Sequence, residues 1–124
     1  MTAREPSAIH EQFADRFNAG DLAGLLALYE DDATLVTAPG ETVTGIEAIR
    51  EALQGFLALR GSIEFVGSDV ALVGGDVALT HGKWVLKVEG MDDVTASTAE
   101  VSRKQLDGTW KYVIDNPYGT QLLD

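Results

Sequence analysis

Two acidic residues near the end of the chain could carry acid–base chemistry. Asp115 lies in the segment "WKYVIDNPYG", immediately before Asn-Pro, and Glu100 lies on an alternating stretch that also contains Ser102 and Lys104. Burial of a carboxyl group in an apolar pocket favours its protonated form, so its pKa moves toward neutral pH and it can take and return a proton. Asp115 is therefore our first candidate for a general base or a hydrogen-bonding anchor, with Glu100 and Ser102 as further catalytic candidates.

The same residues also have a structural interpretation. Residues 115–119 can form a turn that ends a strand, in which Asp115 bonds to nearby amides. Glu100, Ser102 and Lys104 share one face of a strand because side chains alternate. An inward face would make an ion pair or polar patch, and an outward face would meet water or a second subunit. Amphipathicity alone leaves both alternatives open.

Aromatic residues are candidates for the walls of a pocket. In residues 78–88 the even positions are mostly apolar and include Trp84, so we predict that this face is interior. Phe13, Phe17 and Tyr29 fall on two helical stripes, where they either complete the core or stack on a flat ligand. The hydroxyl of Tyr29 could also donate a hydrogen bond to a ligand.

Other kinds of chemistry lack their motifs. The chain has no Cys, which excludes a thiol nucleophile and disulfides and fits a reducing compartment. It has no glycine-rich phosphate loop and no Gly-x-Ser-x-Gly motif. His10 and His81 are too far apart for a helical metal pair, and we interpret both as surface or interface residues. We expect no metal site and no cofactor.

The charge balance argues against anionic partners. With 20 acidic and 9 basic residues the formal net charge is -11, which repels nucleic acid and anionic lipid headgroups. No apolar run approaches the roughly 18 residues that span a bilayer, and the first residues lack the apolar segment of a secretory signal. We expect no nucleic acid or membrane partner and a cytoplasmic location.

Apolar spacing predicts three helices in the first half of the chain. Ile9, Phe13 and Phe17 recur along one face after a possible Ser7 cap. Asp21 is expected to cap a second helix whose stripe is Leu22, Leu25, Leu26 and Tyr29, with residues 30–32 as a polar break before a strand at 33–37. A Thr-x-x-Glu box at Thr44 predicts the start of a third helix, with Ile46, Ile49, Leu53 and Phe56 on its apolar face.

The second half alternates instead. From residue 62 onward, Gly- and Asp-containing breaks at 74–76, 89–93 and 106–108 divide the chain into four strands. The order of elements predicts an α+β fold in which helices cover one face of a curved, mostly antiparallel sheet. Since no linker or repeat is visible, we predict one domain over residues 1–124.

Two segments carry a resemblance to a known family. "FNAGDLAGLLALYEDDATL" followed by "TGIEAIREAL" resembles the ketosteroid-isomerase-like and SnoaL-like branch of the nuclear transport factor two superfamily, and "DGTWKYVIDNPYG" is similar to its closing strand. The resemblance implies a cone-shaped sheet roofed by three helices, a cystatin-like roll, with an apolar pocket at its open end. It does not specify a reaction, because members include isomerases, cyclases, dehydratases and proteins without known chemistry.

The resemblance also assigns positions to individual residues. It puts Phe13 where steroid isomerases have a Tyr donor, Thr37 where they have the Asp base, and Ser102 near their second Asp. A phenyl ring has no donor and a Thr hydroxyl is no base near neutral pH, so that mechanism does not transfer. The family register points the face of Glu100 and Lys104 inward.

For the closing strand, the family register points Lys111, Val113 and Asp115 inward. It leaves the more apolar face of Trp110, Tyr112 and Ile114 for a partner subunit. Because this strand has apolar residues on both faces, and because the family register turns one of them outward, we expect a homodimer.

The sequence and its resemblance leave two candidate functions. The first is a pocket protein that binds a small hydrophobic molecule through Phe13, Phe17, Tyr29, Thr37, Trp84 and Lys104. The alternative is an enzyme of isomerase, cyclase or dehydratase type that uses Asp115 or Glu100 for proton transfer. An enclosed position for Asp115 would favour the enzyme, and an exposed turn would remove its base.

Overall fold

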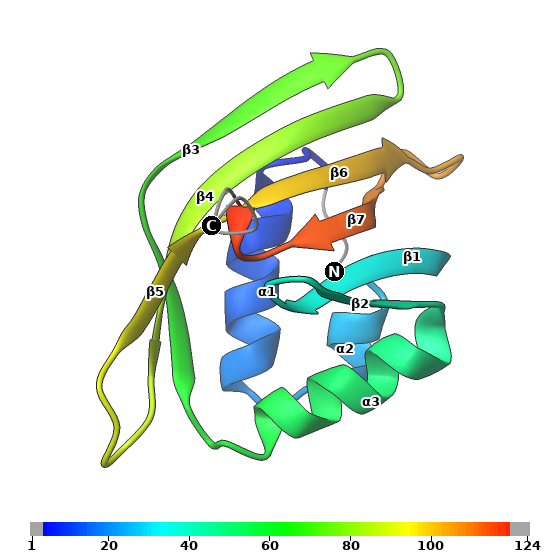
Figure 1. Cartoon of the computed structure of the whole chain (residues 1–124). Coiled ribbons are helices and arrows are strands. Elements are labelled where there is room, and N and C mark those ends of the chain that lie inside the picture. The colour runs from blue at the N-terminus through cyan, green and yellow to red at the C-terminus, as the bar shows by residue number, and fades with distance from the viewer. Residues whose placement is uncertain (1–3, 120–124) are drawn as a thin grey trace.

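The computed structural model describes residues 4–119 of the chain (Figure 1). Within these residues, three helices, α1 (Ala8–Asn18), α2 (Leu22–Leu26) and α3 (Ile46–Leu57), accompany one sheet. Its strands are β1 (Tyr29–Ala38), β2 (Glu41–Thr44), β3 (Ser62–Gly74), β4 (Val77–Lys87), β5 (Val94–Ser97), β6 (Ala99–Lys104) and β7 (Trp110–Asn116). No helix among the described residues is long and apolar enough to cross a membrane.

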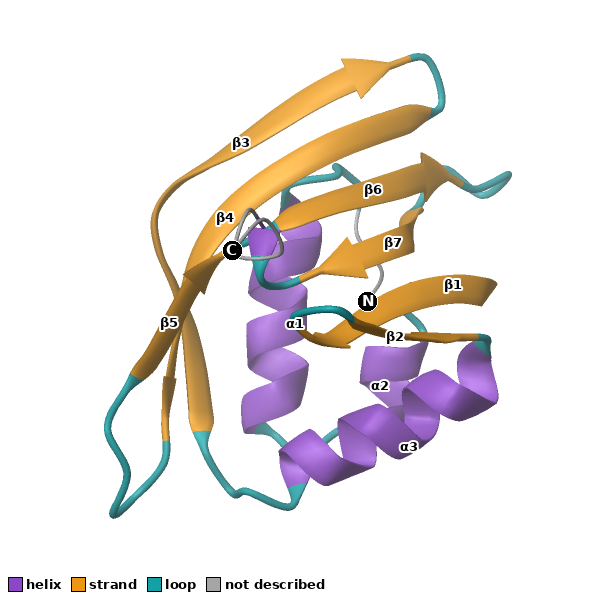
Figure 2. Ribbon diagram, in the orientation of Figure 1, coloured by secondary structure: helices purple, strands orange, loops and turns teal. Residues whose placement is uncertain are grey.

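The sheet curves around the helices and does not close on itself (Figure 2). Its order is β2-β1-β7-β6-β4-β3, with β5 also paired to β4, and among the described strands only the β1–β7 pair is parallel. Strands β5 and β6 both pair with β4 and are interrupted only at Thr98. This is the predicted α+β architecture, a curved and mostly antiparallel sheet with the helices on its concave side.

The helices bury the residues that their spacing predicts. Ile9 and Phe17 of α1 and Ile49 and Leu53 of α3 are all buried in one core cluster. Asp21 caps α2 as expected, because its Oδ1 accepts a hydrogen bond of 2.9 Å from the backbone N–H of Gly24. Burial of these stripes therefore holds the helices against the sheet.

Two expected caps do not form. The Ser7 side chain makes no cap hydrogen bond. Thr44 is the last residue of β2, where its hydroxyl bonds to the hydroxyl of Thr34, and Gly45 takes the N-cap position with a φ of 95°. Pairing of β2 with β1 occupies Thr44, so it is not available for a capping box.

Strand β1 begins earlier than its sequence suggests. Tyr29 pairs with Tyr112 of β7, and residues 30–32 continue the strand instead of breaking it. Helix α2 is accordingly short, and Tyr29 lies on the sheet instead of on a helical stripe. The polar side chains of Asp31 and Asp32 are tolerated in the strand because they are exposed.

A β-bulge in β7 changes which side chains face inward. Val101 pairs with Ile114 and Ser102 pairs with Tyr112, so Val113 has no partner of its own. An extra residue in one strand puts the residues on either side of it out of simple alternation. Tyr112 and Asp115 both become buried, whereas Ile114 is exposed.

The expectation for the closing strand is therefore half right. Asp115 faces inward as predicted, but Trp110 and Tyr112 are buried and not on an outer face. Lys111 and Val113 are only half-buried. Regular alternation cannot predict this arrangement, because the bulge shifts the period by one residue.

Candidate functional site

A cavity of about 150 Å³ lies between the helices and the concave face of the sheet. One water needs about 10–15 Å³ by such a measure, so the space is large enough for a small organic molecule. Its walls are mostly apolar and aromatic, which is typical of a small-molecule site. They are formed by Phe13, Phe17, Tyr29, Leu35, Leu53, Phe56, Leu59, Ile63, Phe65, Trp84, Leu86, Val94, Thr98, Glu100, Tyr112, Asp115, Pro117 and Tyr118.

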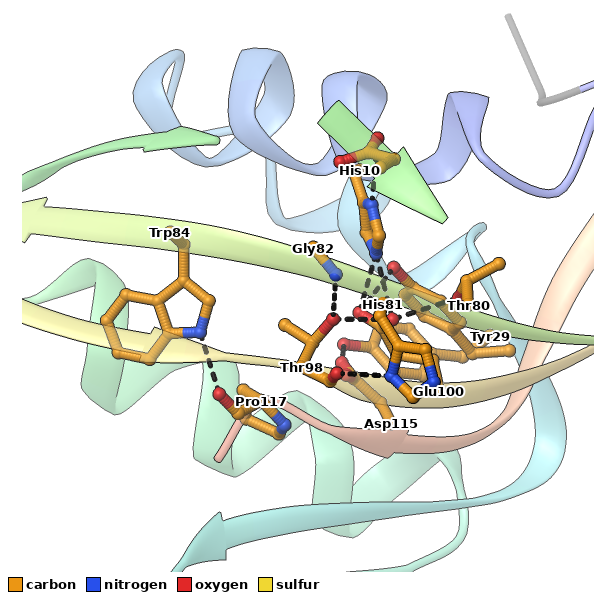
Figure 3. Close-up of polar contacts among 12 residues, drawn as sticks. His10, Tyr29, Thr80, His81, Gly82, Trp84, Thr98, Glu100, Asp115 and Pro117 are labelled. Atoms are coloured by element: carbon orange, nitrogen blue, oxygen red, sulfur yellow. Dashed lines mark hydrogen bonds and ion pairs between the residues drawn. The ribbon is translucent and has the colours of Figure 1, made fainter. Parts of the chain in front are cut away.

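Asp115 is a buried carboxyl group in this apolar wall. Its side chain accepts a hydrogen bond of 2.6 Å at Oδ2 from the hydroxyl of Tyr29 (Figure 3). No described residue donates a hydrogen bond to its Oδ1. One oxygen of Asp115 is therefore available to a molecule in the cavity.

The surroundings of Asp115 raise its pKa from 3.8 to about 7. Burial is the largest cause, and the negative charge of Glu100 adds to it. The hydrogen bond from Tyr29 and the positive charge of His10 act in the opposite direction and offset part of the rise. A carboxyl group with this pKa exchanges its proton near neutral pH, as a general acid or base must.

Glu100 pairs directly with Asp115 across the β6–β7 ladder. Its Oε1 accepts hydrogen bonds from the hydroxyls of Thr80 (2.9 Å) and Thr98 (2.8 Å), as Figure 3 shows. The hydroxyl of Tyr112 makes a longer contact of 3.4 Å with Oε2. These contacts engage both oxygens of the Glu100 carboxyl group and fix its position in the cavity wall.

His10 supplies the positive charge beside Glu100. Its Nε2 lies 2.8 Å from Oε1 and 2.9 Å from Oε2 of Glu100, and its Nδ1 lies 3.1 Å from Oδ2 of Asp69. Its ring stacks on Phe65 with 4.6 Å between centroids. Burial lowers its pKa, but Glu100 and Asp69 outweigh this effect and raise the pKa to about 9. The imidazole is therefore an imidazolium at neutral pH.

The interpretation of His10 as a surface residue is wrong, since only 1% of it is exposed. Its spacing from Phe13 and Phe17 is i, i+3 and i+7, which puts all three on one helix face and could have indicated burial. His81 lies on the opposite face of β4 from the cavity, half-buried, with Nδ1 2.9 Å from the carbonyl oxygen of Thr98.

Six of the nine candidate site residues line the cavity: Asp115, Glu100, Phe13, Phe17, Tyr29 and Trp84. Trp84 faces inward, as the alternation of β4 predicts, and its indole N–H donates a hydrogen bond of 2.7 Å to the carbonyl oxygen of Pro117. This bond ties the segment after β7 to the cavity wall.

The other three candidates lie outside the cavity lining. Lys104, the last residue of β6, is exposed, which keeps its ammonium group hydrated. Ser102 is fully buried behind the lining, and its hydroxyl has no partner among the described residues. Thr37 is half-buried, and its carbonyl oxygen accepts a hydrogen bond from the hydroxyl of Tyr118, which lines the cavity.

Four aromatic residues of the wall were not among the predicted site residues, namely Phe56, Phe65, Tyr112 and Tyr118. The bulge at Val113 hides Tyr112 from an alternation argument. Tyr118 follows the strand in a segment that resembles an exposed turn. Apart from their aromatic character, Tyr112 and Tyr118 carry no sequence signal for a position in the cavity wall.

A curved sheet with helices on its concave side and an apolar cavity between them defines a cystatin-like pocket domain. Residues 10–116 match the model of the SnoaL-like domain. The chain therefore belongs to the SnoaL-like domain family, which confirms the resemblance seen in its sequence. A comparison with curated protein sequences gives no match.

Solved structures agree on the fold. One is a proposed calcium/calmodulin-dependent protein kinase II association domain from Xanthomonas campestris, with 20% identity over 91% of this chain and 84% of that chain and a TM-score of 0.77. Another is a proposed ketosteroid isomerase from Shewanella frigidimarina, with 17% identity over 87% of this chain and 89% of that chain and a TM-score of 0.75.

A third is an NTF2-like superfamily protein from Salmonella enterica, with 14% identity over 88% of this chain and 84% of that chain and a TM-score of 0.76. At such identities these likenesses concern the fold and not the activity.

Proposed function

We propose that this chain binds one small, mostly apolar molecule in the cavity and holds a polar group of that molecule at Asp115. The observation that carries this proposal is the aromatic cavity with one open oxygen of Asp115 in its wall. Apolar walls contribute affinity through burial, and a single polar group fixes orientation.

Steroid isomerisation by the mechanism described above is not part of this proposal. The cavity wall has Phe13, which lacks a hydrogen-bond donor, and Thr37 does not line the cavity. These two positions support a ligand or a reaction different from that of the steroid isomerases.

A neutral fluorescent dye tests the binding proposal. Prodan is small and flat, and its emission shifts to the blue in an apolar site. We expect saturable binding of one dye per chain. The variant Leu86→Trp fills the cavity from strand β4 and should weaken binding about tenfold, whereas Lys87→Trp places the same ring on the exposed face of the same strand. Equal affinity in both variants, or no binding by the unmodified chain, would contradict the proposal.

A second candidate function is proton transfer on the bound molecule. It is favoured by the enclosed position of Asp115, because an exposed turn would have left no base in the cavity. A carboxylate surrounded by apolar walls is a stronger base than one in water.

Nitrobenzisoxazole tests this second candidate, since removal of the proton on C3 of its isoxazole ring breaks the N–O bond and gives a coloured cyanophenolate. We expect a rate that rises with pH through about 7, the pKa of Asp115, and that falls at least a hundredfold in Asp115→Asn. The exposed Asp31 provides a matched control as Asp31→Asn. If the protein binds the compound but does not open its ring faster than buffer does, the proton-transfer function is contradicted and only the binding function remains.

We also propose that two copies associate through the outer face of the sheet. Apolar residues lie in register across four strands there: Leu72 pairs with Leu79, Leu79 with Val101, and Val101 with Ile114. Leu72, Leu79 and Ile114 are exposed. Such a contiguous apolar row on a sheet face supports an interface between subunits.

A further inference from the structure

The polar end of the cavity has fewer positive than negative groups. Glu100 and Asp115 line the cavity, and the imidazolium of His10 lies behind Glu100, between it and the partly exposed Asp69. We treat these four groups as one cluster. No Lys, Arg or His side chain belongs to the described lining of the cavity. With Asp115 ionised, the cluster carries one positive and three negative charges, so its environment favours an additional positive charge or a proton on Asp115.

Aromatic rings line the same cavity as this carboxyl group. The hydroxyl of Tyr29 donates a hydrogen bond to Asp115, and the ring centroids of Tyr29 and Tyr112 lie 5.4 Å apart. The ring centroid of Tyr118 lies 6.4 Å from that of Trp84 in an edge contact. Burial and the negative charge of Asp115 raise the pKa of Tyr118. All four rings line the cavity. Rings of this kind attract cations through their electron-rich faces, most strongly where water is excluded.

The aromatic rings and the unbalanced carboxyl group point to one class of ligand. We propose that the cavity binds a small organic amine, with its ammonium group on Oδ1 of Asp115 and its apolar body against the aromatic walls. This inference rests on the proposed binding function and specifies its ligand. Carboxylates and phosphates are disfavoured, because they would bring a further negative charge to the cluster.

The proton on Asp115 and the ammonium group compete for the same carboxylate. Asp115 has a pKa of about 7, so about one in eleven molecules has it ionised at pH 6 and about ten in eleven at pH 8. Affinity for an amine should therefore rise about tenfold between these pH values, and binding at pH 6 should release close to one proton.

The groups that face Asp115 do not alter the sign of this dependence. The titratable groups are Glu100 on β6, His10 on α1, Tyr29 on β1, Tyr112 on β7 and Tyr118 after β7. Helix α3 and strand β4 contribute only residues that do not titrate to the described lining, namely Leu53, Phe56, Trp84 and Leu86. His10 has a pKa of about 9 and keeps its charge between pH 6 and 8, and the tyrosines have pKa values above their usual 10.0.

Three compounds of nearly equal shape test the inference by isothermal titration calorimetry: phenylpropylamine, phenylpropanol and phenylpropanoate. At pH 8 we expect the amine to bind at least tenfold more tightly than the alcohol, and the carboxylate to bind most weakly. Titrations at pH 6 in two buffers of different ionisation enthalpy measure the proton released by the amine. This measurement needs no variant, so it holds even if a substitution in the cavity impairs folding.

Two variants complete the test. Asp115→Asn should abolish the preference for the amine while the alcohol still binds, and Asp31→Asn on the exposed part of β1 should change neither. The inference is overturned if the alcohol or the carboxylate binds as tightly as the amine, or if no proton is released at pH 6. Prodan binding in the same preparation would then show that the proposed pocket still exists, whereas loss of both dye and alcohol binding would reject the proposed function as well.

Discussion

His10 on helix α1 and Glu100 on strand β6 form a buried ion pair, with Nε2 of the imidazole 2.8 Å from Oε1 of the carboxylate. The pair ties the first helix to the centre of the sheet directly beside the cavity (Figure 3). An intact buried ion pair stabilises a fold little more than apolar residues of the same volume would. Loss of one partner, however, is strongly destabilising, because it leaves a buried charge without compensation.

Substitution of His10 should therefore destabilise the chain strongly. We expect His10→Ala to lower the free energy of unfolding by about 3–5 kcal/mol, because Glu100 is left buried and unpaired. The double variant His10→Ala, Glu100→Gln should recover part of this loss, since a neutral amide costs less to bury. Urea denaturation at pH 6 measures both, and a double variant no more stable than His10→Ala would contradict the assignment.

The same pair gives a defined pH dependence. His10 has a pKa of about 9 in the folded chain and 6.5 as its reference value, so its stabilisation is fully present below pH 6.5 and is lost as pH rises through 9. The difference in stability between the unmodified chain and His10→Ala should shrink accordingly between pH 6 and pH 9.5. A constant difference over that range would show that His10 is not charged in the folded chain.

Gly82 on β4 makes room for His10. A Cβ atom at this position would lie 2.8 Å from both Cε1 and Nδ1 of the imidazole. We expect Gly82→Ala to cost about 1–3 kcal/mol through overpacking and to shift the ring resonances of His10 in NMR spectra. Gly74→Ala at the end of β3 is the control, because nothing lies within 4 Å of its added Cβ. Similar small effects for both would mean that the ring can move away freely.

Asp115 opposes folding once it is ionised. Its pKa is about 7 in the folded chain against a reference of 3.8, so stability falls as pH rises from about 4 to 7, by up to about 1.4 kcal/mol per pH unit. Asp115→Asn cannot ionise, and its carbonyl oxygen can still accept from Tyr29. The variant should therefore gain stability relative to the unmodified chain between pH 5 and pH 8, as urea denaturation would show. If the free energies of unfolding of the variant and the unmodified chain differ by the same amount at pH 5 and at pH 8, this prediction is contradicted.

The outer apolar row predicts a dimer that one charge can break. Leu79→Lys places an ammonium group in the middle of the row, where it would lose hydration in an interface. We expect the mass measured by light scattering to fall from two chains to one. Leu106→Lys, on an exposed turn, is the control and should leave the mass unchanged. A single-chain mass for the unmodified protein would argue against this interface.

Much of the architecture was predictable because it depends on local periodicity. The stripe of Ile49 and Leu53 on α3 and the inward face of Trp84 on β4 follow from spacing alone, because burial of one face is the main source of stability for each element. The cap at Asp21 was predictable for the same local reason. The boundary between α2 and β1 was not, since pairing of Tyr29 with Tyr112 outweighs the helical preference of its stretch.

The sequence by itself determined the family and the curved sheet with its roof of helices, and it left Asp115 open between an inward carboxyl group and a turn that ends the last strand. The tertiary structure alone decided that His10 is buried against Glu100, that Tyr112 joins Asp115 on one face, and that Lys104 stays outside. The physical reason is that these features depend on a bulge at Val113 and on contacts between residues far apart in the chain, which no local period encodes.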